Sequence, residues 1–151
     1  MNRKLLPLLL AALLASCGRS TPPASLTIDL ETEFTLAPGQ SASLAASSLT
    51  INLVGVSNDE RCPSDIECAA SGPVTLTISV QKEGGEPVEF TLQTFTGYDG
   101  RSPEGPFEGI QDRVEFEGYL IRVKGVLPYP VKAVNEIKDS EYRVTFLFTA
   151  K

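Results

Sequence analysis

With 151 residues, the chain is long enough for one domain with a sizeable core and too short for two. It contains no histidine, so it lacks the commonest general base near neutral pH and the commonest neutral metal ligand. The net charge is −6 and the lysines and arginines are scattered, which argues against nucleic-acid binding because phosphate recognition needs grouped positive charge. We expect neither a cofactor nor catalysis.

Residues 1–16 have the three-part plan of a secretory signal peptide. Arg3 and Lys4 form a basic front, and an apolar run from Leu5 to Leu14 leads to small residues. The apolar run is too short to span a bilayer as a helix. Removing residues 1–16 leaves 11 basic and 19 acidic residues, so the remaining chain carries a charge of 11 − 19 = −8.

The segment Leu14-Ala15-Ser16-Cys17 resembles the lipobox of bacterial lipoproteins. The resemblance implies lipidation of Cys17, cleavage before it and a lipid-anchored, extracytoplasmic protein of the cell envelope, since two or three acyl chains hold a protein firmly at a membrane. Gly18, rather than an aspartate, follows and favours the outer membrane where the organism has one. A free thiol or an intermolecular disulfide is the alternative for Cys17. Residues 17–25 are then a polar, proline-containing tether.

Residues 26–151 are predicted to be one all-β domain. In Val74–Val80, four apolar side chains alternate with three hydroxyl side chains, and Val88–Gln93 repeats this period of two. The Gly- and Pro-containing connector between them predicts an antiparallel hairpin. Further strand patterns occur in the ranges Leu26–Leu30, Phe34–Leu36, Leu49–Val56, Tyr119–Val123 and Tyr142–Phe148.

Seven or eight short strands of this kind favour an antiparallel two-sheet β-sandwich, Ig-like in general architecture, over a small β-barrel. A weak helical pattern covers Val131–Asp139. The proline-rich segment Leu127–Pro130 is predicted to end a strand and turn the chain, and a polyproline ligand is the alternative.

The loop Asp59–Cys68 contains the two cysteines that remain besides Cys17. In an oxidising compartment we expect a Cys62–Cys68 disulfide, for which the loop-entropy model gives about 2.4 kcal/mol of stabilisation. Pro63 stiffens the turn, and Ile66 is predicted to pack beneath it. The spacing is not that of a Cys-x-x-Cys redox pair.

A second interpretation of this loop is a rigid, exposed element that docks into a partner, as the reactive loops of small protease inhibitors do. Its candidate interaction residues are Arg61, Pro63, Ser64 and Asp65.

The mature sequence also resembles a family of small secreted or lipid-anchored bacterial proteins with a Ser-Arg-Cys-Pro-x-x-Val-x-Cys core followed by an aromatic residue and a glycine. The resemblance rests on the stretches 34–42 and 59–68, on Gly72 and Val74, on Pro128-Tyr129-Pro130 and on the final strand from Tyr142. Glu60 stands where the family often has serine, and Ala70 where it usually has tryptophan. The resemblance implies the fold and export and adds no reaction.

The long Gly/Pro-rich connection Thr96–Asp112 carries several acids. Candidate calcium ligands there are Asp99, Glu104, Glu108 and Asp112, and near the disulfide Asp59 and Asp65. No twelve-residue calcium loop and no nucleophilic serine motif is present, and the absence of tryptophan disfavours a glycosidase.

The sequence therefore predicts a lipid-anchored envelope module that is not an enzyme and that binds an unidentified protein or glycan partner or has a structural role. The alternatives are an inhibitor of secreted proteases that uses the Cys62–Cys68 loop, and a calcium-dependent carbohydrate binder or small hydrolase.

Overall fold

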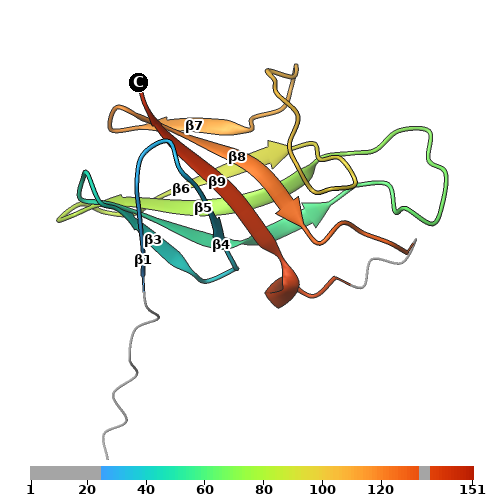
Figure 1. The fold of residues 1–151 in the computed structure, drawn as a ribbon, viewed down its shortest axis with the longest axis horizontal. Coiled ribbons are helices and arrows are strands. Elements are labelled where there is room, and N and C mark those ends of the chain that lie inside the picture. Colours follow the sequence, from blue (N-terminus) through green and yellow to red (C-terminus); the bar gives the residue numbers. More distant parts are fainter. Residues whose placement is uncertain (1–24, 133–136) are drawn as a thin grey trace, which may run out of the picture.

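The computed structural model describes residues 25–132 and 137–151. In this part of the chain nine strands form two open sheets that pack face to face (Figure 1). The five-stranded sheet has the order β1 (Leu26–Ile28), β3 (Ser41–Leu44), β4 (Leu49–Asp59), β5 (Val74–Lys82), β6 (Val88–Thr94). The four-stranded sheet has the order β2 (Glu33–Leu36), β9 (Arg143–Ala150), β8 (Tyr119–Leu127), β7 (Arg113–Phe116). The predicted β-sandwich is confirmed, and the sheets do not close into a barrel.

The core lies between the two sheets and is built from the alternating strand patterns. In β5, the side chains of Val74, Leu76, Ile78 and Val80 are all fully buried. From the facing sheet, the Phe34 ring stacks on those of Phe146 and Phe148, with centroids 5.9 and 5.8 Å apart. Full burial of one such side chain contributes roughly 1.5–3 kcal/mol.

The hairpin predicted for Val74–Gln93 is present. β5 and β6 pair in antiparallel register from Val74 opposite Thr94 to Val80 opposite Val88. The other neighbouring strands also pair antiparallel, except that β1 pairs parallel with β3. β1 is an edge strand, and only Ile28 of its three residues is buried.

Two strands and one helix differ from the sequence expectations. β3 and β7 were not predicted as strands. The helix predicted over Val131–Asp139 is wrong in its described part, where the only helical turn is a 3-10 helix at Asp139–Glu141, and residues 133–136 lie outside the described residues. The signal peptide, Cys17 and the tether up to residue 24 also lie outside them.

The long connection between β6 and β7 is fixed along β8. The amide of Ser102 donates to the Lys124 carbonyl at 2.9 Å, and the amide of Val126 donates to the Gly100 carbonyl at 2.8 Å. At Gly125, a Cβ would lie 2.7 Å from the Gly100 carbonyl oxygen, so glycine permits this close approach. Residues 100–102 of the connection therefore lie beside the last residues of β8, at the end of the sandwich that also carries the cysteine loop.

Candidate functional site

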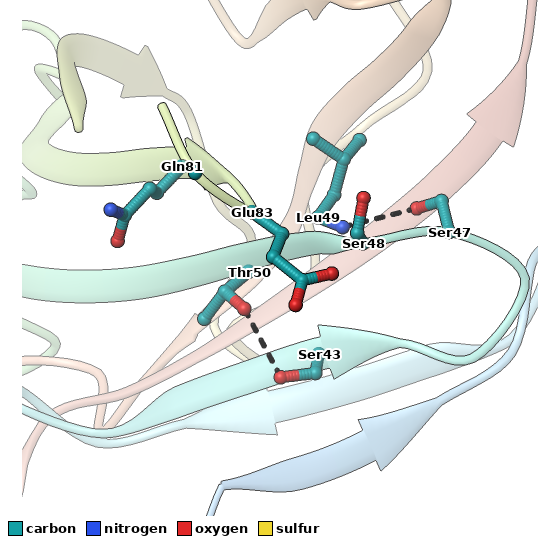
Figure 2. A pocket seen from close by; sticks show the side chains of 8 residues that line it. Ser43, Ser47, Ser48, Leu49, Thr50, Gln81 and Glu83 are labelled. Atoms are coloured by element: carbon teal, nitrogen blue, oxygen red, sulfur yellow. Dashed lines mark hydrogen bonds between the residues drawn. The ribbon is translucent and has the colours of Figure 1, made fainter. Parts of the chain in front are cut away.

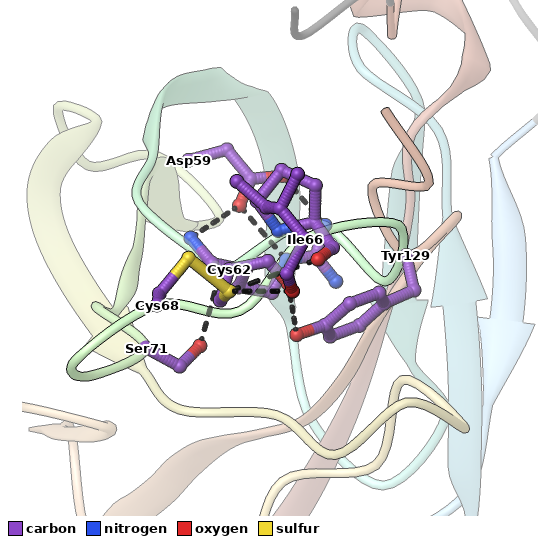
Figure 3. Close-up of a disulfide and its surroundings, with 8 residues drawn as sticks. Asp59, Cys62, Ile66, Cys68, Ser71 and Tyr129 are labelled. Carbon is purple, nitrogen blue, oxygen red and sulfur yellow. Dashed lines mark hydrogen bonds and ion pairs between the residues drawn. A yellow bond between two sulfur atoms is a disulfide. The ribbon is translucent and has the colours of Figure 1, made fainter. Parts of the chain in front are cut away.

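The cysteine loop connects β4 to β5, and the segment after β8 leaves the sheet at the same end of the sandwich (Figure 1, right-hand side). Cys62 and Cys68 are joined by a disulfide with their Cα atoms 5.9 Å apart, as predicted. Figure 3 shows the bridge beside Tyr129, whose hydroxyl points at the loop backbone. The amide of Cys62 donates to the Ser71 hydroxyl at 3.1 Å. These contacts close the loop upon itself.

A buried ion pair lies beneath the loop. The guanidinium of Arg61 grips the Asp59 carboxylate through Nε at 2.8 Å and a terminal nitrogen at 2.6 Å, and both side chains are almost completely buried. The other N–H groups donate to the Val126 carbonyl at 2.9 Å, the Pro128 carbonyl at 2.8 Å and the Thr96 hydroxyl at 3.3 Å. All five N–H donors of Arg61 thus have an acceptor, which offsets the cost of removing its charge from water.

Two tyrosines extend this network. The Tyr129 ring lies 5.0 Å from the guanidinium carbon of Arg61, in cation–π geometry, and its hydroxyl donates to the Cys62 carbonyl at 2.7 Å. The Tyr142 hydroxyl donates to the Asp59 carboxylate at 3.1 Å. The ion pair therefore ties the cysteine loop to the segment after β8 and to the start of β9.

The proposed interaction residues of the loop divide into two groups. Arg61 is 3% exposed, so its expected role as a contact residue is wrong. Its guanidinium is instead paired with the Asp59 carboxylate and hydrogen-bonded to backbone carbonyls. Pro63 is half-buried, whereas Ser64 and Asp65 are exposed. Ile66 was expected to pack beneath the loop, but it is 44% exposed.

The backbone of the loop is hydrogen-bonded to the segment after β8. The amide of Ser64 donates to the Pro130 carbonyl at 3.1 Å, and the amide of Asp65 donates to the Val131 carbonyl at 3.0 Å. The proline-rich segment does end β8, as predicted. The loop and this segment form one braced surface.

Large apolar side chains are exposed on this surface. We call them the loop-end cluster: Ile66 (44% exposed), Tyr98 (72%), Leu127 (48%) and Val131 (63%). The Tyr98 ring packs edge-on against the Tyr129 ring, with centroids 4.9 Å apart. The Leu127 side chain lies over Gly100, where a Cβ would be 2.4 Å from it.

Sequence reasoning missed three members of the loop-end cluster. Tyr98, Leu127 and Val131 stand in Gly/Pro-rich segments outside any alternating pattern, and apolar residues there were not assigned to the core. Their location in such segments could have indicated their exposure, because a large apolar residue outside the predicted strands has no core face on which to be buried.

Three exposed carboxylates are chain neighbours of the loop-end cluster, and one exposed cation, Lys132, follows Val131. Asp65 and Glu67 flank Ile66 on the cysteine loop, and Asp99 follows Tyr98. Glu60 is exposed on the same loop, but its side chain accepts a hydrogen bond from Asn58 and lies against Gly72. Asp99 accepts the amide of Arg101 at 3.0 Å.

The calcium candidates are not gathered into one site. Among the described residues, no group of three or more acidic, cysteine or histidine side chains is placed to hold a metal ion. Asp59 is paired with Arg61, and Asp112 is paired with Arg113 and Arg122. Three of the six candidates, Asp59, Glu104 and Asp112, are thus paired with arginine side chains.

A second charged cluster joins two acids of the long connection, Glu104 and Asp112, to Arg122 and Lys124 of β8. Glu104 accepts hydrogen bonds from Lys124 and Arg122, which lower the pKa of this exposed carboxyl to about 2. Burial raises the pKa of Asp112, but hydrogen bonds from Arg113 and Arg122 outweigh that effect, so it lies below its ordinary value. This cluster holds the connection against β8.

An open hollow of about 430 Å³ lies at the other end of the five-stranded sheet (Figure 2). Serine and threonine hydroxyls line it, together with Gln81 and Glu83. The Ser43 and Thr50 hydroxyls hydrogen-bond each other at 3.2 Å, and Ser47 accepts the Leu49 amide at 3.3 Å. The hydroxyls are thus partly used within the sheet, and no aromatic ring lines the hollow to stack on a sugar.

The fold and the site define a disulfide-braced two-sheet β-sandwich with an apolar loop end. Comparison of the chain with known protein families, with curated proteins and with solved structures finds no match. The resemblances to bacterial lipoproteins and to a secreted family remain predictions. Ala70, where that family usually has tryptophan, is exposed. In the described part of the chain, no helix has the length and apolar character to cross a membrane.

Proposed function

We propose that this protein is a lipid-anchored, extracytoplasmic binding module of the bacterial envelope that performs no catalysis. Cys17 carries the lipid, residues 17–25 form the tether and the β-sandwich presents its loop end to a partner. The loop-end cluster carries this proposal, because four large apolar side chains stand exposed on a surface whose backbone is fixed by a disulfide and by a buried ion pair.

Rigidity supports binding rather than movement at this surface. A loop that is already ordered loses little conformational entropy when a partner docks, so more of the contact energy appears as affinity. The disulfide supports export, since such bridges persist in oxidising compartments.

The anchor is tested with the Cys17→Ser variant in a bacterial host fed a clickable palmitate analogue. The wild-type protein should incorporate the label and sediment with membranes, whereas the variant should do neither. Equal membrane retention of both proteins would overturn the anchor.

The binding role is tested by crosslinking in intact envelopes. A photoreactive phenylalanine analogue is introduced singly at Tyr98, Val131, Val54 and Val88, the last two being exposed apolar positions on β4 and β6. A discrete adduct that forms in the envelope and is competed by added purified protein is expected from at least one position. Adducts from none of the four would overturn the binding role.

The alternative functions receive less support from the geometry. A protease-inhibitor loop must offer its backbone to the protease, yet the amides of Ser64 and Asp65 are already bonded within the protein. A calcium-dependent binder needs converging oxygens, and the described acids do not supply them.

A further inference from the structure

We propose that the loop-end cluster binds a protein segment in which large apolar side chains are flanked by lysine or arginine. The inference rests on the proposed binding function and names the partner chemistry of its site. It follows from two independent properties of the surface, its apolar centre and its acidic border.

The apolar centre is preorganised. Tyr98 is held by its edge-on contact with Tyr129, and Tyr129 is itself fixed by the Arg61 guanidinium and by the Cys62 carbonyl. Leu127 rests on the Gly100 backbone. Tyrosine in a fixed orientation is a frequent energetic anchor of protein interfaces because it offers a large contact area with few rotatable bonds.

The acidic border of the cluster predicts that the partner is positively charged. Within residues 25–132 and 137–151, Asp65, Glu67 and Asp99 take part in no salt bridge, although three other carboxylates are paired with arginine or lysine. These three acids outnumber the one exposed cation beside the cluster, Lys132. Three carboxylates beside an apolar centre attract basic side chains and accelerate their association.

The same charges disfavour two other occupants. A second copy of the chain docked symmetrically through this surface would set the three carboxylates against their equivalents. A surface of anionic lipid would be repelled in the same way. A basic, apolar polypeptide meets both properties at once.

The test uses the purified full-length protein and a random twelve-residue peptide library displayed on phage. We expect the selected peptides to share one or two large apolar residues next to lysine or arginine. The strongest peptide is then synthesised and its affinity is measured by fluorescence anisotropy at 50 and at 500 mM salt. Affinity should fall at the higher concentration because the border acts through exposed charges.

Variants locate the site. Tyr98→Ser and Val131→Ser should each weaken the peptide about tenfold, which corresponds to roughly 1.4 kcal/mol. The double variant Asp65→Lys/Glu67→Lys should weaken it at least about fivefold and remove much of the salt dependence. Val54→Ser is the matched control, since Val54 is 46% exposed on β4, and it should change the affinity less than about twofold.

Circular dichroism must show unchanged folding in each of the four variants, which is expected because all five substituted side chains are exposed. Selection of acidic or uncharged peptides, or equal losses in the Val54 and Val131 variants, would overturn the inference. In the envelope experiment, adducts from Val54 or Val88 alone would overturn this inference and the placement of the site at the loop end, and would leave a binding role on another face of the domain. Adducts from no position would end the binding role as well.

Discussion

At the scale of single residues, Arg61 shows how a surface-type side chain becomes part of the interior. It lies in a loop directly after two acidic residues, yet it is buried with Asp59. An isolated buried charge is strongly unfavourable, so the pair depends on each partner and on the carbonyls of Val126 and Pro128. The exposed apolar surface above it is held in place by this internal contact.

Replacing Arg61 by leucine should destabilise the protein by about 3–5 kcal/mol, because the Asp59 carboxylate then stays buried without a counter-charge. Urea unfolding followed by circular dichroism measures the loss. The double variant Asp59→Asn/Arg61→Leu should recover part of it by removing the orphaned charge. The exposed pair of Arg101 and Glu33 is the matched control, and Arg101→Leu should cost at most about 1 kcal/mol. Equal losses at Arg61 and Arg101 would contradict the role of burial.

Gly100 offers a second residue-scale prediction. It has φ = 75°, and a Cβ there would lie 2.4 Å from the Leu127 side chain and 2.9 Å from the Val126 carbonyl oxygen. Gly109 has almost the same φ, 76°, with no atom within 4 Å of such a Cβ. Gly109→Ala should therefore show the backbone cost alone, about 1–2 kcal/mol, and Gly100→Ala a larger loss. Thermal unfolding compares the two, and identical shifts in melting temperature would contradict the close packing of Leu127.

At the scale of elements, the cysteine loop has two kinds of brace. The disulfide restricts the unfolded chain, whereas the hydrogen bonds from Ser64, Asp65 and Tyr129 act in the folded state. The contribution of each to the free energy of unfolding can be measured separately, because the disulfide can be removed without removing the hydrogen bonds.

The double variant Cys62→Ser/Cys68→Ser should lose about 2 kcal/mol, somewhat less than the loop-entropy value, and keep both sheets. Unfolding curves of the oxidised wild-type protein and of the variant give the difference, and far-ultraviolet circular dichroism reports the strands. Adding a reductant to the variant should change nothing, which controls for effects of the reagent. A variant without strand signal would show that the bridge is required for folding itself.

The sequence predicts elements where burial follows a simple period. β5 and β9 alternate apolar and polar side chains, so their strands and their core faces were predictable. β3, with the sequence Ser-Ala-Ser-Leu, carries small residues and gives little contrast between its faces. The burial of Arg61 could not be predicted, since two of its acceptors are the backbone carbonyls of Val126 and Pro128, more than sixty residues further along the chain. The loop-end cluster likewise depends on three segments that only the fold brings together.

At the scale of the whole molecule, acid should weaken the fold. The pKa of Glu104 is lowered from its ordinary value of 4.5 to about 2 by Lys124 and Arg122, and those of Glu33 and Asp112 are also lowered. A carboxyl with a lowered pKa in the folded state stabilises the protein above its ordinary pKa and loses that contribution as pH falls toward the folded value.

The melting temperature should accordingly decline between about pH 4.5 and pH 2. Differential scanning calorimetry at half-unit steps follows the decline. Glu104→Gln should flatten part of it, because the glutamine does not titrate. Glu108→Gln, at an exposed acid of the same connection, serves as the control and should retain the wild-type slope. A Glu104→Gln curve with that same slope would contradict the ion-pair cluster as the source.

The parallel pairing of β1 with β3 has a mechanical consequence. Tension applied through Ser25 acts first on β1, a three-residue edge strand in which only Ile28 is buried. When β1 is pulled away, β3 keeps β4 as its neighbour, and the pairing of the other seven described strands is unchanged. A force applied at the amino-terminal side of the domain would thus detach β1 and extend the chain by a few residues before it acted on the remaining strands of the two sheets.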